Sequence, residues 1–498
     1  MMQLGLDLGT SGVKAVLVGE DGAVCEQAQA PLDLRHARPL WSEQDPADWW
    51  QAAEAAVQQL RLRKDLSGVG AIGLSGQMHG AVLLDAAERV LRPAILWNDG
   101  RSHAECVELE AAEPLSRSIT GNLAMPGFTA PKLLWVRRHE PEIFARVARV
   151  LLPKDWLRLK LAGKAVSDLS DASGTLWLNV GRRRWSPEML AATGLDERHM
   201  PALAEGTEPT GTLRPEIADA WGVPRGAIVA AGAGDNAAGA VGIGCIAPGQ
   251  AFVSLGTSGV IFVADDRFLP DPARAVHAFC HCLPGLWHRM SVMLSAAASL
   301  TWAARVGGAR DEAALLAELE AAGLGANGNL VFLPYLSGER TPHNDATARG
   351  VFFGLAAATT RADLTRAVLE GVAFGLADGL EALEAAGPRI ERFSMIGGGA
   401  QSASWGRILA AALQRPLVFH AAGEVGPALG AARLARIAAG GGSVAEVCRP
   451  PPVMRVQEPE PDLAAQLAPR RALFRRLYPA LRESFAPSPV AAVPSVNS

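Results

Sequence analysis

A six-residue string occurs twice in this chain of 498 residues, letter for letter and about half a chain apart. Residues 8–13 and residues 255–260 both read Leu-Gly-Thr-Ser-Gly-Val. In each copy an apolar run leads into a Gly-Thr-Ser-Gly turn, which predicts two strands joined by a hairpin. Glycine lets a backbone approach a ligand closely, and successive N–H groups form a nest for an anion. The repeat therefore predicts two related domains that face each other across a phosphate; chance repetition of two ordinary turns is the alternative.

Strand-like and helix-like patterns alternate in both halves of the chain. Short apolar runs predict strands at residues 4–6, 13–18, 23–30, 69–74, 227–231 and 393–396, and a hairpin at 250–264. Helix starts are indicated at Asp45-Pro46, at Thr360 with Asp363 three residues later, and at Pro427. Residues 100–220 are expected to form mostly helices and loops. This alternation predicts an α/β fold.

The length of the chain exceeds what one hydrophobic core ordinarily holds, and it suits two domains. We expect the first domain at residues 1–247 and the second at residues 248–484. Residues 485–498 are rich in Pro, Ser, Val and Ala without periodicity, which predicts a disordered tail.

The net charge of −4 excludes the basic footprint of a protein that binds nucleic acid or an anionic membrane surface. The N-terminus lacks the pattern of a secretory signal, and no apolar stretch reaches the roughly 18 residues of a membrane span. Six scattered cysteines in so large a chain are typical of a reduced, cytoplasmic protein.

Short motifs follow one another along the chain in an order that resembles a known family. Residues 7–11, 256–258 and 397–399 resemble elements of the superfamily of sugar kinases, actin and heat-shock-chaperone ATPases. Residues 126–135 and 338–354 are similar to signatures of the FGGY carbohydrate kinases within it. The segments that resemble the D-xylulose-phosphorylating branch of that family are residues 40–46, 76–80, 97–101 and 234–239. The resemblance extends over about residues 3–480.

The resemblance implies two ribonuclease-H-like domains of the actin-like ATPase kind, with a cleft between them. It also implies ATP-dependent phosphorylation of D-xylulose to D-xylulose 5-phosphate in pentose catabolism, with Mg²⁺, and related enzymes suggest a homodimer. Two alternatives stay open. One is another sugar or polyol kinase of the family, acting on ribulose, gluconate or glycerol; the other is a non-enzymatic ATPase switch of the actin or chaperone kind.

Asp235 stands between Gly234 and Asn236, directly after a predicted strand. Phosphoryl transfer to a hydroxyl needs a carboxylate that accepts the hydroxyl proton, and a side chain at this turn can reach into a cleft. We expect an ordinary pKa of about 4, so that Asp235 is ionised at neutral pH. A helix N-cap is the alternative role; the resemblance implies the general base.

No Walker A string occurs in the sequence, so the phosphates of ATP must be held in another way. The turn residues Thr10, Ser11, Gly256 and Thr257 offer N–H and hydroxyl donors for them. Asp7, one residue before the first repeat, is expected to hold Mg²⁺ directly or through water. The alternative for this carboxylate, a buried turn residue bonded to backbone amides, is costly in mid-strand.

Gln77, Met78 and His79 follow a predicted strand directly. Amide and imidazole groups bond hydroxyls, and a thioether packs on C–H faces. The resemblance implies that Met78 and His79 line the sugar pocket, with Gln77 and Asn236 as further contacts. The segment that ends at Asp99 is expected to wall the same cleft, with a polar contact from that carboxylate. Without the resemblance, a Met-His pair is more often part of a core.

Three successive glycines, residues 397–399, follow another predicted strand. They resemble the adenosine-binding element of the family, which implies Gly398, Gly399 and Gln401 at the nucleotide. Glycine suits this role because the backbone can approach adenine or ribose closely. A tight turn or a helix C-cap is the alternative.

His277, Cys280, His281 and Cys282 form a local cluster that mimics a metal site. Their spacing fits no usual zinc pairing, and no second Cys or His pair stands nearby in the sequence. We interpret them as strand and core residues of a reduced protein.

Overall fold

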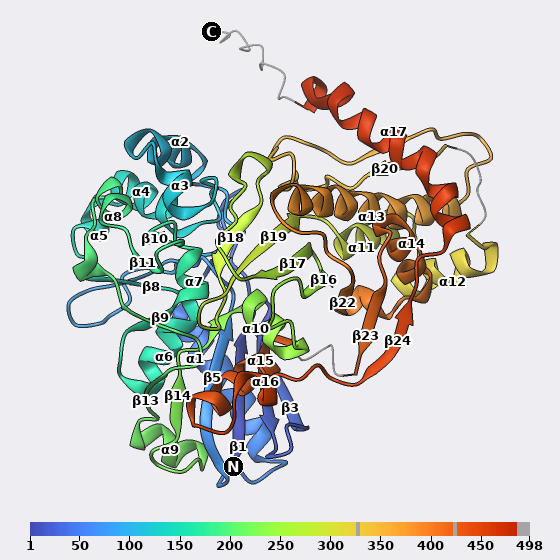
Figure 1. Ribbon diagram of the computed structural model, residues 1–498. Coiled ribbons are helices and arrows are strands. Elements are labelled where there is room, and N and C mark those ends of the chain that lie inside the picture. The colour runs from blue at the N-terminus through green and yellow to red at the C-terminus, as the bar shows by residue number, and fades with distance from the viewer. Residues whose placement is uncertain (325–328, 422–425, 486–498) are drawn as a thin grey trace, which may run out of the picture.

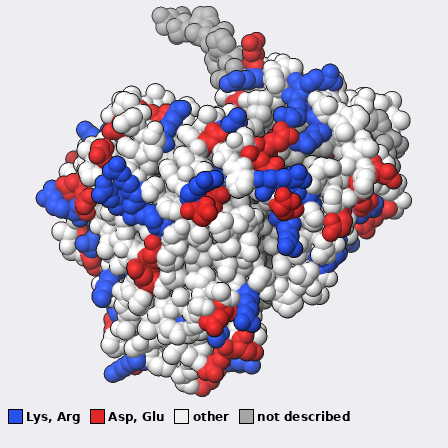
Figure 2. Space-filling model, viewed as in Figure 1, with Lys and Arg blue, Asp and Glu red and all other residues white. Residues whose placement is uncertain are grey.

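The computed structural model describes residues 1–324, 329–421 and 426–485, and it contains two large mixed sheets surrounded by helices (Figure 1). The predicted tail lies outside the described residues, apart from Phe485, at which the last helix ends. No helix in the described part of the chain combines the length and the apolar character that crossing a membrane requires. Figure 2 shows acidic and basic side chains intermixed over the face that it presents.

The first copy of the repeat forms the centre of the first sheet. Its strands are β1 (Met2–Leu8), β2 (Gly12–Val18), β3 (Val24–Pro31), β5 (Val69–Gly76), β13 (Pro209–Thr212), β14 (Ile228–Ala230) and β15 (Ala233–Gly234). The order across the sheet is β13-β14-β5-β1-β2-β3, and β15 also pairs with β5. The β1–β2 pair is antiparallel, whereas β1–β5 and β5–β14 are parallel.

The second sheet repeats this pattern around the second copy. Its strands are β16 (Ala251–Leu255), β17 (Gly259–Asp265), β18 (His277–Cys280), β19 (Trp287–Met293), β22 (Phe393–Ile396), β23 (Leu417–His420) and β24 (Val453–Gln457). The order is β18-β19-β17-β16-β22-β23-β24, and again the two strands of the repeat are antiparallel, whereas β16–β22 and β22–β23 are parallel. The prediction of two related α/β domains is therefore confirmed.

The capping signals correctly located the starts of two long helices, α1 and α13. Helix α1 (Pro46–Arg61) begins after Asp45, whose carboxylate accepts a hydrogen bond from the Ala47 N–H at 3.0 Å. Helix α13 (Arg361–Ala386) begins after a capping box formed by Thr360 and Asp363. The other helices near the sheets are α9 (Pro215–Trp221), α10 (Asp235–Ile243), α11 (Ala297–Val306), α12 (Glu312–Ala322), α14 (Ala403–Leu413), α15 (Gly426–Ala438), α16 (Val444–Val447), α17 (Pro461–Phe485) and the short η2 (Pro272–Arg274) and η3 (Gly398–Gln401).

Short elements between β5 and β13 form an additional lobe, in line with the prediction for residues 100–220. Its helices are α2 (His103–Ala112), α3 (Ser116–Thr120), α4 (Thr129–His139), α5 (Pro141–Phe144), α6 (Pro153–Ala162), α7 (Leu169–Ser173), α8 (Pro187–Ala192) and η1 (Glu197–His199). The two- to three-residue strands outside the large sheets are β4 (Glu43–Gln44), β6 (Val82–Leu84), β7 (Ala94–Ile95), β8 (Arg149–Leu151), β9 (Val166–Asp168), β10 (Leu178–Asn179), β11 (Arg184–Trp185), β12 (Ala202–Ala204), β20 (Val331–Leu333) and β21 (Val351–Phe353).

Helix α15 comes from the second half of the chain but packs on the first sheet, as Figure 1 shows by its red ribbon beside the blue strands. Close contact is possible because the sheet presents Gly5 and Gly73, where a Cβ atom would collide with the carbonyl oxygens of Ala428 and Ala431. The two halves of the sequence are therefore not two separate bodies, and the boundary between residues 247 and 248 stays a prediction.

A core of aromatic and aliphatic side chains joins the additional lobe to the second sheet. It contains Phe128 and Trp177 of the lobe together with Phe262 and Phe279 of strands β17 and β18. Burial of such large side chains stabilises the junction by about 25 cal/mol for each Å² of apolar surface removed from water. Several of its side chains also form one side of a cavity between the two halves of the chain.

Candidate active site

A small cavity of about 110 Å³ lies between residues of the two halves of the chain. It is lined by Met78, His79, Trp97, Asp235, Asn236, Ser258, Val260, His277, Phe279, Met290, Val292 and Arg340. Four of the predicted site residues, namely Met78, His79, Asp235 and Asn236, are thus brought together although up to 158 positions separate them. The segment ending at Asp99 contributes Trp97 to the wall.

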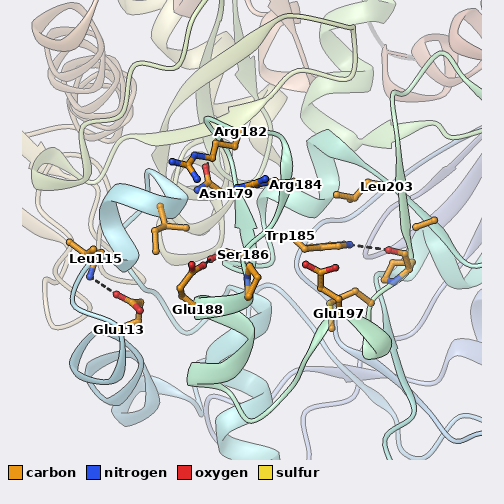
Figure 3. Close-up of a pocket in the computed structure, with 15 residues that line it drawn as sticks. Glu113, Leu115, Asn179, Arg182, Arg184, Trp185, Ser186, Glu188, Glu197 and Leu203 are labelled. Carbon is orange, nitrogen blue, oxygen red and sulfur yellow. Dashed lines mark hydrogen bonds between the residues drawn. The ribbon is translucent and has the colours of Figure 1, made fainter.

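A larger hollow of about 790 Å³ lies on the additional lobe and contains none of the predicted site residues. Figure 3 shows side chains of both charges around it, including Arg182, Arg184, Glu188 and Glu197. The smaller cavity, by contrast, brings four of the predicted site residues together. The smaller cavity is therefore the candidate active site.

Asp235 is the first residue of α10 and follows strand β15 directly. The residue at the N-cap position is Gly234, so the alternative N-cap role of Asp235 is wrong. One carboxylate oxygen, Oδ1, accepts hydrogen bonds from the backbone N–H of Asn236 at 2.7 Å and from its Nδ2 at 2.8 Å. The Gly234 N–H donates to the Ser170 hydroxyl at 3.1 Å and anchors the turn. These bonds hold the carboxylate at the cavity.

The pKa of Asp235 is not ordinary, and the prediction of a value near 4 is wrong. Burial and, to a smaller extent, the negative charge of Asp7 together raise this pKa to about 7, against the lowering effect of the two Asn236 bonds. The sequence could not reveal this because neither burial nor the second carboxylate is visible in the local motif. A pKa near neutrality suits a group that takes up a proton during the reaction.

Asp7 lies in β1, and its Oδ1 accepts a hydrogen bond from the Ser75 hydroxyl at 2.8 Å. Burial raises the pKa of Asp7, although the Ser75 bond and the charge of Lys14 lower it. Its bond therefore comes from a hydroxyl, and the predicted alternative of a turn residue bonded to backbone amides finds no support in these contacts.

The residues present fit a magnesium ion that arrives with a nucleotide. Within the described ranges, no group of three or more acidic, His or Cys side chains is arranged to hold a metal. Mg²⁺ keeps several waters and commonly uses one or two carboxylates together with substrate phosphates. Asp7, which acts electrostatically on Asp235, supplies such a carboxylate.

His79 follows β5 in the left-handed backbone region, with φ of 70°. Its Nδ1 lies 2.8 Å from the carbonyl oxygen of Gly174 and therefore carries the proton. Burial lowers the pKa of His79 to about 3, so the ring is neutral and its Nε2 is a hydrogen-bond acceptor. The ring of Phe128 meets it edge to face at 4.8 Å.

Two predicted contacts are not in the cavity wall. Gln77 lies behind it, where its Oε1 accepts from the Thr10 hydroxyl at 3.2 Å and its Nε2 donates to Gln44 at 3.1 Å. Asp99 is 2% exposed, and Arg101 binds both of its carboxylate oxygens at 2.7–3.0 Å. Its predicted polar contact with a ligand is wrong because a structural cation already satisfies the charge.

The hydroxyl of Thr10 makes its hydrogen bonds within the protein. It accepts a hydrogen bond from Trp97 Nε1 at 2.9 Å and donates its single proton to Gln77. The prediction of a hydroxyl donor for phosphate at this residue is therefore wrong. The backbone N–H groups of Thr10 and Ser11 have no acceptor among the described residues and stay available to an anion.

The second copy of the repeat is held by a helix. The Gly256 carbonyl accepts from the Ala297 N–H at 2.9 Å, and the Thr257 carbonyl accepts from Ala296 at 2.9 Å. These donors begin α11, so this helix N-terminus is already occupied by the turn. Ser258, the next residue, lines the cavity.

The three glycines after β22 differ in their surroundings. Gly397 has φ of 90°, and a Cβ there would lie 2.8 Å from the Leu255 carbonyl oxygen. Gly399 packs on the side chain of Leu255, with 2.7 Å to a Cβ. Gly398 alone of the three faces open space among the described residues. The predicted role of the Gln401 side chain lies outside what the structure describes.

Sequence reasoning missed the apolar residues that the second half of the chain contributes to the cavity wall, and two of its polar ones, His277 and Arg340. His277 belongs to the Cys-His cluster, whose other members are core residues as predicted. The side chain of His277 is 3% exposed. His277 and Phe279 are two residues apart on β18, and this spacing could have predicted that both side chains lie on one face of the strand. Arg340 lies in the signature at residues 338–342, to which the motif itself assigns no chemical role.

Comparisons with known proteins agree on one family. Residues 2–242 match the model of the N-terminal domain of the FGGY family of carbohydrate kinases, and residues 251–439 match that of its C-terminal domain. The chain is 54% identical to the xylulose kinase of Escherichia coli (strain K12) over 478 residues, 96% of this chain and 98% of the relative.

Solved structures give the same result. A crystal structure of a xyloylose kinase from Brucella ovis matches with a TM-score of 0.93 at 52% identity, covering 97% of this chain and 100% of that one. A gluconate kinase from Lactobacillus acidophilus matches with a TM-score of 0.89 at 26% identity, covering 97% and 99%. Kinases named for two different substrates thus share the fold of this chain.

Proposed function

This chain belongs to the FGGY family of carbohydrate kinases, and we propose that it transfers the γ-phosphoryl group of ATP to the C5 hydroxyl of D-xylulose. The products are D-xylulose 5-phosphate and ADP. The observation that carries the chemistry is that Asp235, with a pKa near 7, shares one small cavity with Met78 and His79. The choice of sugar is supported by 54% identity to a curated xylulose kinase over nearly the whole chain.

Asp235 acts as the general base. Its carboxylate accepts the proton of the reacting hydroxyl as the oxygen attacks phosphorus, and Asn236 holds the carboxylate in place through its two hydrogen bonds. Met78 packs on the C–H face of the sugar, and His79 accepts a hydrogen bond from a sugar hydroxyl at Nε2. Gln77 supports this site from behind through Thr10.

The nucleotide lies across the two turns of the repeat. The N–H groups of Thr10 and Ser11 face the γ-phosphate, and Gly256 and Thr257 hold the other phosphates. The adenosine lies at Gly398, Gly399 and Gln401. Mg²⁺ bound through Asp7 would neutralise charge on the phosphates.

We place the two domains at residues 1–247 and 248–484, with α15 returning to the first sheet. Closure of the cavity between them would exclude water, so that the sugar hydroxyl and not water attacks the phosphorus. A homodimer remains part of the proposal.

A panel of substrates tests the function. ADP release is measured with D-xylulose, D-ribulose, glycerol and gluconate, and we expect the highest kcat/KM with D-xylulose. A higher kcat/KM with gluconate would instead assign to this chain the substrate for which the matched Lactobacillus acidophilus kinase is named. ATP turnover that ignores every sugar would instead indicate an ATPase switch.

A further inference from the structure

The cavity also contains the guanidinium of Arg340, to which the proposed phosphoryl transfer assigns no role. Arg340 lies in the segment between β20 and β21, and it is the one cationic side chain among the described residues that line the cavity. In the described part of the chain its guanidinium has no hydrogen bond or ion pair to the protein, whereas its backbone N–H donates to Glu339 Oε1 at 2.8 Å. Its planar set of donors is therefore available to a ligand.

The segment around Arg340 is fastened to its neighbours. The Thr341 hydroxyl donates to the carbonyl oxygen of Ala275 at 2.8 Å. Gly127, in the segment at residues 126–135, lies beside the guanidinium: a Cβ atom there would lie 2.5 Å from the carbonyl oxygen of Trp97 and 3.1 Å from Nη2 of Arg340. The absence of a side chain at Gly127 therefore leaves room for both the Trp97 backbone and the guanidinium.

Two neutral imidazoles lie near this cation. His277 Nδ1 is 3.3 Å from Asn122 Oδ1, and the Asn122 amide is fixed because its Nδ2 donates to the Ala278 carbonyl at 2.9 Å. Nδ1 of His277 therefore carries the proton, and its Nε2 has no protein partner among the described residues. His79 is held in the same tautomer by Gly174. Both rings present a lone pair, which accepts from ligand hydroxyls.

Arg340 and the two imidazoles form one group within the cavity wall. The Arg340 charge lowers the pKa values of His79 and His277, in each case after the larger effect of burial. The pKa of Asp235 is instead affected by burial and by Asp7. The ring of Phe128, the residue after Gly127, meets the rings of His79 at 4.8 Å and His277 at 5.4 Å, so the guanidinium and the two imidazoles lie together in the wall that Asp235 also lines.

The substrate offers one group for the base and another for the cation. A five-carbon 2-ketose closes its ring through the C5 oxygen, so its C5 hydroxyl can react only in the open-chain form. In that form the ketone at C2 lies near the opposite end of the carbon chain. A ketone oxygen only accepts hydrogen bonds, in the plane of its lone pairs, whereas a hydroxyl also donates.

We propose that Arg340 donates hydrogen bonds to the C2 ketone oxygen of an open-chain ketose whose C5 hydroxyl contacts Asp235. Arg340 is then the residue that selects ketoses over the corresponding alditols. The inference rests on the proposed function and adds the form of the sugar that the site binds.

The test compares D-xylulose with xylitol, which has a hydroxyl in place of the ketone. We expect the unaltered chain to favour D-xylulose by at least about tenfold in kcat/KM, because the charged donors fit the ketone better. Arg340→Met keeps most of the side-chain length but removes the donors. It lowers kcat/KM for D-xylulose by about 100-fold and that for xylitol by less than about threefold.

Arg349→Met is the matched control. Arg349 lies in the same segment, is exposed, and bonds only backbone carbonyls of its own turn, Ala346 and Ala348. Its loss leaves both substrates within about twofold, as expected for an exposed site. Equal losses on both substrates in Arg340→Met, or no loss on D-xylulose, would overturn the inference alone. Absence of D-xylulose turnover by the unaltered chain would overturn the proposed function and this inference with it.

A second variant covers the case in which Arg340→Met does not fold, as judged by circular dichroism. Arg340→Lys keeps the positive charge but loses the planar fork. We expect a loss of about tenfold for D-xylulose and a smaller one for xylitol. Equal losses on the two substrates would again contradict the assignment of Arg340 to the ketone.

Discussion

The two copies of the repeated hexapeptide are identical in sequence and different in structure. In the first, Leu8 pairs with Val13 and residues 9–12 form the turn; in the second, Leu255 pairs with Gly259 and residues 256–258 form it. The strand register thus differs by one residue although every letter is the same.

The surroundings explain the difference. The carbonyl of Thr10 accepts from the Gln44 side chain at 2.7 Å, and that of Ser11 accepts from the Leu32 N–H at 3.0 Å. The second turn is bound instead by the first residues of α11. The residue before the repeat differs too, since Asp7 in the first copy corresponds to Ser254 in the second. Residues outside the repeat therefore distinguish the two copies. A carboxylate, that of Asp7, directly precedes the first copy, whereas the uncharged Ser254 precedes the second.

The largest effect should come from the base that only the first half supplies. Asp235→Asn removes the proton acceptor but keeps the shape of the side chain. We expect kcat to fall by about 10³- to 10⁴-fold, with KM for sugar and ATP changed little. ADP-release kinetics measure this, and isothermal titration with D-xylulose checks that binding is retained. Near-normal kcat would remove Asp235 from the role of base.

A second experiment makes the first turn resemble the second. Asp7→Ser removes the carboxylate, and we expect the concentration of Mg²⁺ needed for half-maximal rate to rise on the order of 100-fold. Ser254→Ala, at the corresponding position, should leave the Mg²⁺ dependence unchanged. If both variants respond equally, the two turns do not differ in the way proposed.

The pH dependence of kcat/KM should report the raised pKa of Asp235. Because the base must be ionised, activity rises with pH through about 7 and falls about tenfold for each unit below it. In Asp7→Ser the negative neighbour is gone, so the midpoint moves to lower pH. A profile that is flat between pH 5 and pH 8 would contradict the raised value.

The smallest effect concerns stability at equivalent glycines of the two copies. A Cβ at Gly12 would lie 2.6 Å from the backbone carbonyl of Ala30, whereas one at Gly259 would first meet side chains, the nearest being that of Ala296 at 3.1 Å. We expect Gly12→Ala to lower the free energy of unfolding by about 1–3 kcal/mol and Gly259→Ala to lower it less. Urea unfolding monitored by tryptophan fluorescence compares the two, and the reverse order would contradict this account.

The architecture was predictable because its signals are local. The repeat, the caps at Asp45 and Thr360, and the short apolar runs each depend on a few adjacent residues, and each lies where it was predicted. The return of α15 to the first sheet was not predictable, since it depends on glycines of β1 and β5 that are distant in sequence.

The residues of the site were predictable only where they belong to a short sequence motif. Met78, His79 and Asp235 follow strands and lie in one cavity, as expected from their positions. The pKa of Asp235, the commitment of the Thr10 hydroxyl and the burial of Asp99 depend on partners from other segments. His277 and Arg340 come from the second half of the chain, and no local pattern connects them with Asp235.

The position of α15 has a consequence for biosynthesis. The face of the first sheet that includes Val16 and Ala71 is covered by Leu429 and Ala435, which leave the ribosome some 360 residues after Ala71 and some 200 residues after Ala230 of the same face. Since chains emerge from the N-terminus at about 5–20 residues per second, this apolar face stays open to water for tens of seconds. The earliest part of the molecule to be synthesised is thus among the last to be completed.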